Sequence, residues 1–194
     1  MKNILIDLGC HKFEGLNKLL NDNIIDHTFF VHAYEANPYV FEESNLNKKM
    51  FNFANFEHYN EAVTNYDGEI VLNLDQTNKS QGCNILPEPP SEDVLWKTKY
   101  EWKHIKIPCV SIKNVLSRCD IKPDDNLIIK CDIEGSEFDV LKMLLVDCHL
   151  TNVTKILVEW HERFWFPNHS IKIKQKEELI SKFKEQNIIL EYWE

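Results

Sequence analysis

Short apolar runs alternate with amphipathic stretches along the chain. The clearest example starts at Leu127, where three apolar residues in succession are typical of a strand that is covered on both faces. Charged residues begin where this strand ends, Gly135 permits a tight turn, and apolar residues then recur at helical spacing. Residues 127–145 are therefore predicted to form a strand, a sharp turn and a helix that Ser136 caps.

The same alternation continues on both sides of this unit. Apolar runs predict strands over residues 4–8, 29–35, 57–63, 69–74, 105–110, 153–160 and 188–193. Helices are predicted after Gly15, from Pro38 with Asn37 as cap, after the cap Ser111, and over residues 173–186. The strand 69–74 follows Asp67-Gly68, as in a hairpin. Strands that alternate with helices predict a doubly wound, mainly parallel α/β sheet with helices on both faces.

One domain is predicted over residues 1–194. A chain of this length with 43% hydrophobic residues can bury a sizeable core, and no repeat or linker divides it. Residues 75–104 are mostly polar, contain three prolines and show no sustained period. We therefore expect a long loop or an irregular insertion there.

Composition narrows the range of partners. The chain has 31 acidic and 22 basic residues and a formal net charge of −9, so nucleic acids and anionic membranes are poor partners for its average surface. No apolar run approaches the ~18 residues of a membrane span, and we expect a soluble, cytoplasmic protein. The six cysteines show no Cys-x-x-Cys spacing, which favours buried, reduced thiols.

Polar residues follow the predicted strands at their carboxyl ends. Asp7 and Gly9 follow the first strand, Glu35 follows the second, and Asp132 follows the central one. In open α/β sheets ligands bind at this edge, and the spacing from Gly9 to Glu35 is a little longer than the ~20 residues between a nucleotide-binding glycine turn and its ribose-binding acid. The residues by themselves therefore predict a nucleotide-type site.

Four segments in this order resemble a known family. They are Ile6-Asp-Leu-Gly-Cys10, Ala33-Tyr-Glu-Ala-Asn-Pro38, Asn60-Glu-Ala-Val63 with Asp67-Gly68, and, most specifically, residues 127–137. The chain is similar to the FkbM family of S-adenosylmethionine-dependent methyltransferases, which has the class I Rossmann-like fold. The resemblance implies S-adenosylmethionine as cofactor and methylation of a hydroxyl group.

The resemblance assigns the residues at the strand ends to two tasks. It implies a cofactor site formed by Asp7, Gly9, Cys10, Glu35, Ala36, Asn37, Asn60, Glu61, Ala62 and Asp132. For the chemistry we expect Lys130, Asp132, Glu159 and His161. The chain departs from the family at Phe13, where a second glycine is usual, and has Gly15 two residues later.

Three of the acidic residues also have structural interpretations. Asp132 can form an ion pair with Lys130, and Glu134 can shape the turn. Glu137 can be a first-turn acid that the helix dipole favours, a role that needs no chemistry.

The proton of an acceptor hydroxyl has several candidate destinations. Asp132 or a neutral His161 can act as the base. Alternatively, Asp132, Glu159 and His161 can hold Mg²⁺ or Mn²⁺. We favour the metal-free alternative, because these ligands are spread over two strands and form no compact ligand motif.

The acceptor is expected to be a neutral sugar or another small polyol. The chain is acidic, and Trp96, Tyr100 and Trp102 in the polar segment can stack on the apolar faces of such a molecule, although they can equally be packing residues. Two other functions stay open. An NAD-linked oxidoreductase also fits a glycine turn and a ribose-binding acid, and Phe13 fits a catalytically dead module that binds a cofactor or a partner.

Overall fold

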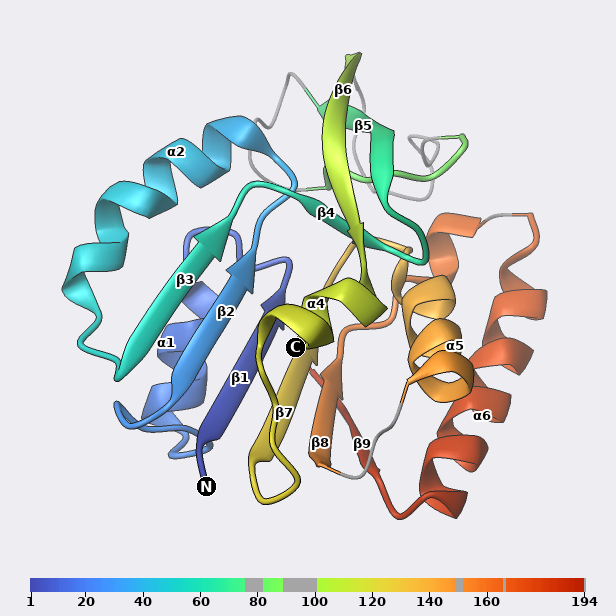
Figure 1. Ribbon diagram of the computed structural model, residues 1–194. Coiled ribbons are helices and arrows are strands. Elements are labelled where there is room, and N and C mark those ends of the chain that lie inside the picture. The colour runs from blue at the N-terminus through green and yellow to red at the C-terminus, as the bar shows by residue number, and fades with distance from the viewer. Residues whose placement is uncertain (76–81, 89–100, 149–151, 166, 194) are drawn as a thin grey trace.

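The structure is a computed structural model that describes residues 1–75, 82–88, 101–148, 152–165 and 167–193 (Figure 1). Its central sheet has six strands in the order β3-β2-β1-β7-β8-β9, and all neighbouring pairs are parallel. The strands are β1 (Asn3–Leu8), β2 (Phe30–Tyr34), β3 (Asn55–Tyr59), β7 (Asn126–Cys131), β8 (Val153–Val158) and β9 (Ile189–Tyr192). The predicted Rossmann-like α/β fold is confirmed.

A second sheet of three strands lies beyond the carboxyl ends of the central strands, at the top of Figure 1. It contains β4 (Ala62–Thr64), β5 (Gly68–Asp75) and β6 (Trp102–Ser111), in the order β4-β6-β5. The prediction of one strand over 57–63 was wrong, because the chain breaks after Tyr59 and continues in this second sheet. The expected hairpin at Asp67-Gly68 was also wrong, since β4 and β5 both pair with β6.

Helices cover both faces of the central sheet. They are α1 (Glu14–Asn21), α2 (Pro38–Asn47), α4 (Ile112–Arg118), α5 (Glu137–Asp147) and α6 (His169–Glu185), with short 3-10 helices η1 (Lys48–Met50) and η2 (Glu162–Trp165). The predicted caps Asn37 and Ser111 accept hydrogen bonds from the amides of Tyr39 and Asn114. Ser136 is the N-cap residue of α5, as predicted, but its side chain makes no capping hydrogen bond.

Two apolar clusters result from the alternation of side chains along the strands. Ile4 and Ile6 of β1 pack with residues of α4, α5 and α6, whereas Leu5 packs with residues of α1 on the other face. This arrangement explains why the central strands read as continuous apolar runs. Among the described residues no helix has both the length and the apolar character needed to span a membrane.

Most of the expected insertion at 75–104 lies outside the described residues. Residues 82–88 are described, and Asn84 in this segment exchanges two backbone hydrogen bonds with Asn73 of β5, at 2.7 and 3.2 Å. This pairing holds the segment 82–88 against the second sheet. The single domain over 1–194 stays a prediction.

Phe13 precedes α1 and has a left-handed backbone, with φ at 70°. Its side chain is fully buried and packs edge-on against Phe51, Phe56 and His58, with ring centroids 5.0 to 5.5 Å apart. The position therefore has the backbone conformation that favours glycine, and the strain of a bulky residue there is offset by aromatic packing.

Two substitutions at Phe13 separate packing from strain. Phe13→Ala should lower the free energy of unfolding by about 3–5 kcal/mol, because it leaves a cavity. Phe13→Gly should cost about 1 kcal/mol less than Phe13→Ala, since glycine adopts the positive φ without strain. Leu16 of α1 is the control, because it is buried within a helix and its glycine variant should be about 1 kcal/mol less stable than its alanine variant. Urea unfolding followed by circular dichroism measures the stability of all four variants. If the alanine variant were the more stable one at both positions, the backbone strain at Phe13 would be contradicted.

Candidate cofactor and active site

A cleft of about 650 Å³ lies at the carboxyl ends of the central strands. Gly9 and Cys10 after β1, Glu35 and Ala36 after β2, Glu61 and Ala62 near β4, and Asp132 after β7 line it. These are seven of the ten residues expected at the cofactor. The other three, Asp7, Asn37 and Asn60, do not line the cleft but support residues that do.

Gly9 is required by the way β1 ends. Its φ is 76°, and a Cβ at this position would lie 1.8 Å from the backbone oxygen of Asp132. The backbone of Asp132 in turn donates to the carbonyl oxygen of Leu8 at 3.0 Å. The turn after β1 and the turn after β7 are therefore in direct contact, which only a glycine allows.

Lys130 is a buried cation beneath this contact. Its Nζ lies 3.1 Å from Asp7 Oδ1 and 3.4 Å from Asp132 Oδ2, and it donates to the carbonyl oxygen of Gly9 at 3.0 Å. Burial alone would lower the pKa of Lys130, but the charges of Asp7 and Asp132 outweigh it and raise that pKa. These contacts favour a charged, positioning role for Lys130, and Asp7 acts through it.

Gly15 leaves the room that Lys130 needs. A Cβ at Gly15, in the first turn of α1, would lie 2.7 Å from Lys130 Cε. Phe13, by contrast, is absent from the lining of the cleft and packs in the aromatic cluster on the α1 face. The side chain of Phe13 therefore does not enter the cleft.

Glu35 is a buried carboxylate at the end of β2. Its Oε2 accepts from the backbone N–H of His11 at 2.9 Å, and its Oε1 accepts from that of Asn37 at 2.8 Å. Burial raises the pKa of Glu35 to about 7, although these backbone bonds oppose the shift. Each oxygen keeps capacity for a further donor, so the carboxylate can accept two hydroxyl groups from a ligand in the cleft.

The neighbours of Glu35 hold this end of the cleft in place. Asn60 Nδ2 donates to the carbonyl oxygen of Glu35 at 2.8 Å and thereby fixes the break between β3 and β4. Glu61 forms a salt bridge with Arg118 of α4. Ala62 presents a small apolar side chain at the cleft.

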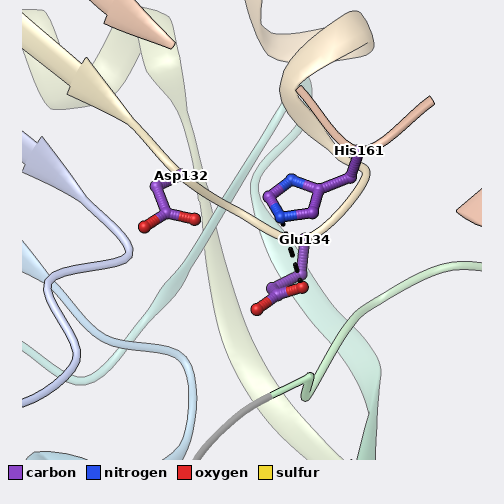
Figure 2. Close-up of side chains that lie close together, drawn as sticks. All are labelled: Asp132, Glu134 and His161. Carbon is purple, nitrogen blue, oxygen red and sulfur yellow. Dashed lines mark ion pairs between the residues drawn. The ribbon is translucent and has the colours of Figure 1, made fainter. Parts of the chain in front are cut away.

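At the other end of the cleft, titratable side chains that follow β7 and β8 lie close together. His161 Nε2 lies 3.5 Å from Glu134 Oε2 and 3.4 Å from Glu159 Oε1. Asp132, Glu134 and His161 each offer a ligand atom within 4.8 Å of the others, as Figure 2 shows for their side chains. The expected set of Asp132, Glu159 and His161 was therefore wrong in one member, because Glu134 takes the place of Glu159 in this group, and among these described residues the Glu159 carboxylate pairs only with His161.

Burial and mutual contacts set the charges of this group. Burial raises the pKa of Asp132 and raises that of Glu134 to about 6. A hydrogen bond from His161 lowers the pKa of Glu159. Burial alone would lower the pKa of His161, but the carboxylates of Glu137, Glu159 and Glu134 beside the ring raise it well above the usual value. These carboxylates therefore favour the imidazolium form of His161.

The residues present fit a nucleoside-type cofactor. The volume of the cleft is within the usual range for small-molecule sites, about 300–1,000 Å³. His11, which lines the cleft, has a buried Nε2 without a hydrogen-bond partner among the described residues. For a divalent ion, Asp132, Glu134 and His161 supply hard oxygen and imidazole ligands, but His161 would have to give up its proton first.

The sequence analysis underestimated one part of the cleft and missed another. Glu134 was expected near the site as a residue that shapes the turn, yet it lines the cleft itself, with a backbone φ of 54°. Cys83 and Asn84 line the cleft from the segment 82–88, which no periodicity marks. The left-handed backbone of Glu134, beside Gly135, is typical of a functional site, but the sequence does not reveal it.

The comparison with known families agrees with this geometry. The methyltransferase FkbM domain matches residues 21–189. The chain belongs to the FkbM methyltransferase family, as its resemblance predicted, and the match begins after the first of the four motifs, residues 6–10. No curated protein and no solved structure shows a significant match to the chain.

Removal of the buried cation should destabilise the protein strongly. Lys130→Met should lower the free energy of unfolding by about 3–5 kcal/mol, because it leaves Asp7 buried without its counter-charge. Lys155→Met is the matched control, since Lys155 pairs with Glu191 at 3.0 Å on the surface and its loss should cost about 0–1 kcal/mol. Urea unfolding of both variants measures the difference. Equal losses would show that Lys130 is no more important to the fold than a surface lysine.

Proposed function

We propose that this protein transfers the methyl group of S-adenosylmethionine to a hydroxyl of a neutral sugar or another small polyol. Membership of the FkbM methyltransferase family supports a methyltransferase. The observation that carries the cofactor assignment is the buried carboxylate of Glu35, which lines the cleft and keeps acceptor capacity on both oxygens.

The cofactor end of the cleft suits a nucleoside. The carboxylate of Glu35 would accept the two ribose hydroxyls, and Ala62, Val63 and Leu72 offer an apolar surface for the adenine ring. When bound, S-adenosylmethionine supplies a methyl group on a positively charged sulfur. The carboxylates of Asp132, Glu134 and Glu159 at the other end favour that positive charge.

The acceptor end would orient a hydroxyl and take up its proton. His161 is an imidazolium that already faces two carboxylates, so it suits binding of the acceptor oxygen better than proton abstraction. Asp132 and Glu134 are the bases favoured by this arrangement, because burial raises the pKa of both carboxyls. A raised pKa brings a carboxylate closer to the operating pH, where general bases act best.

The proposed acceptor is a neutral polyol because of the charges around the cleft. Carboxylates at both ends disfavour a polyanion such as a nucleic acid. Trp102 begins β6 of the second sheet and is partly buried, whereas Trp96 and Tyr100 lie outside the described residues. Stacking of these rings on a sugar stays a prediction.

The two alternatives are less well supported. NAD carries a negatively charged pyrophosphate, which would meet the carboxylates that line the cleft. A dead binding module was suggested by Phe13, but this side chain is buried in the aromatic cluster with Phe51 and Phe56. Methyl transfer therefore agrees better with the charges and with the packing.

The affinity for S-adenosylmethionine should depend on pH through Glu35. Ribose hydroxyls donate to the ionised carboxylate, and the pKa of Glu35 in the free protein is about 7. Binding should therefore weaken about tenfold from pH 8 to pH 6, because the fraction of ionised Glu35 falls by about that factor. Isothermal titration calorimetry across this range measures the slope.

Two variants and a second ligand control this titration. Glu35→Gln should bind more weakly and lose the slope, whereas Glu57→Gln, at an exposed carboxylate of β3, should change neither. NAD titrated in parallel should not bind. Tighter binding of NAD than of S-adenosylmethionine, or no binding of either S-adenosylmethionine or its demethylated product at millimolar concentration, would refute the proposed cofactor.

Asp132→Asn should abolish turnover, because it removes a base that acts on the acceptor, and should leave the affinity for S-adenosylhomocysteine, whose sulfur carries no charge, within about twofold. The substrate for this assay comes from a screen of sugars, small alcohols and capped RNA with S-adenosylmethionine labelled in its methyl group.

Turnover should also survive exhaustive treatment with EDTA, as a metal-free mechanism requires. Loss of turnover with EDTA and its return with Mn²⁺ would instead identify Asp132, Glu134 and His161 as metal ligands.

A further inference from the structure

Glu137 connects the two loops that carry the acceptor end of the cleft. It is the first residue of α5, and its side chain is fully buried. Its Oε2 accepts from the backbone N–H of Gly135 at 2.8 Å, in the turn after β7. Its Oε1 accepts from the backbone N–H of His161 at 2.6 Å, in the loop after β8. One carboxylate thus holds both loops at a fixed distance.

This contact also sets the direction of the His161 ring. Nδ1 of His161 lies 3.5 Å from the same Oε1 of Glu137, which is a contact between charges, because Nδ1 has no hydrogen-bond partner among the described residues. The opposite nitrogen, Nε2, consequently faces Glu134 and Glu159 in the cleft. Figure 2 shows the ring with this nitrogen turned toward Glu134. The ring is nearly fully buried, so its orientation is not free to vary.

The helix dipole does not account for the placement of Glu137. Asp139 lies in the same first turn of α5 and is exposed, which is the placement that a dipole interaction at the surface requires. A fully buried carboxylate costs free energy unless hydrogen bonds replace its lost water. For Glu137 those bonds come from Gly135 and His161.

We propose that Glu137 is a positioning residue that fixes the backbone of His161 through a hydrogen bond and attracts the Nδ1 side of its imidazole through charge, with Nε2 toward the acceptor end of the cleft. Glu137 does not line the cleft, so it acts through His161 and Glu134. The catalytic consequence rests on the proposed methyl transfer. The positional part depends only on the hydrogen bonds and can be measured without any acceptor.

Amide hydrogen exchange in the full-length chain tests the positional part. In the wild type the amides of Gly135 and His161 should exchange slowly, although both lie in loops. Glu137→Gln keeps the shape of the side chain but has one accepting oxygen in place of two, so one of these amides should exchange at least about tenfold faster. Asp139→Asn is the matched control, because it removes the same charge from the same helical turn and should change neither amide.

The ring and the cofactor give two further readouts. The ring ¹⁵N resonances of His161 should shift in Glu137→Gln and stay in place in Asp139→Asn. Calorimetric titration with S-adenosylhomocysteine should give the same affinity in all three proteins. With the acceptor found by the screen, kcat should fall by about 100-fold in Glu137→Gln at unchanged KM, the effect of a displacement of about 1 Å at a reacting group.

Three results would overturn the inference. Rapid exchange of both amides in the wild type would refute the hydrogen bonds, even if Glu137→Gln failed to fold. Equal effects of the Glu137 and Asp139 variants would show that both act only through the helix dipole. An unchanged kcat in Glu137→Gln with shifted His161 resonances would make the contact structural. A screen without any acceptor counts against the proposed acceptor class and leaves the exchange measurements valid.

Discussion

The ammonium group of Lys130 lies between the carboxylates of Asp7 and Asp132, at the point where β1 and β7 end. Asp7 and Lys130 are directly opposite each other in the parallel pairing of these strands, so their side chains share one face of the sheet. A buried cation is tolerated only where such partners surround it. The glycines at positions 9 and 15 are needed because the backbone and the lysine occupy the space that a Cβ would fill.

Sequence patterns predicted the central sheet well because its strands are buried on both faces and their ends are charged. Sequence patterns failed where the structure depends on contacts between segments that are distant along the chain. The break after Tyr59 has no period of its own, and it depends on Asn60, which bonds to the backbone of Glu35. The pairing of β6 with β4 and β5 likewise joins segments that lie far apart along the chain.

The candidate site, too, was predicted in part from the sequence. The spacing of polar residues after the strands identified Glu35, Asp132 and His161, because parallel strands end at one edge. Sequence does not distinguish a buried acid from an exposed one in the same helical turn, so Glu137 and Asp139 looked alike. The two residues differ in burial and in role, since Glu137 is buried and accepts hydrogen bonds from both loops, whereas Asp139 is exposed.

Protonation gives the two ends of the cleft different properties. At the cofactor end, Glu35 has a pKa of about 7 and changes charge near neutral pH. At the other end, Glu134, Glu137 and Glu159 surround His161 and favour its charged form. An imidazolium donates hydrogen bonds from both nitrogens and accepts none. In the proposed methyl transfer it would therefore orient the acceptor oxygen and stabilise negative charge that develops on it, and the proton would pass to a carboxylate.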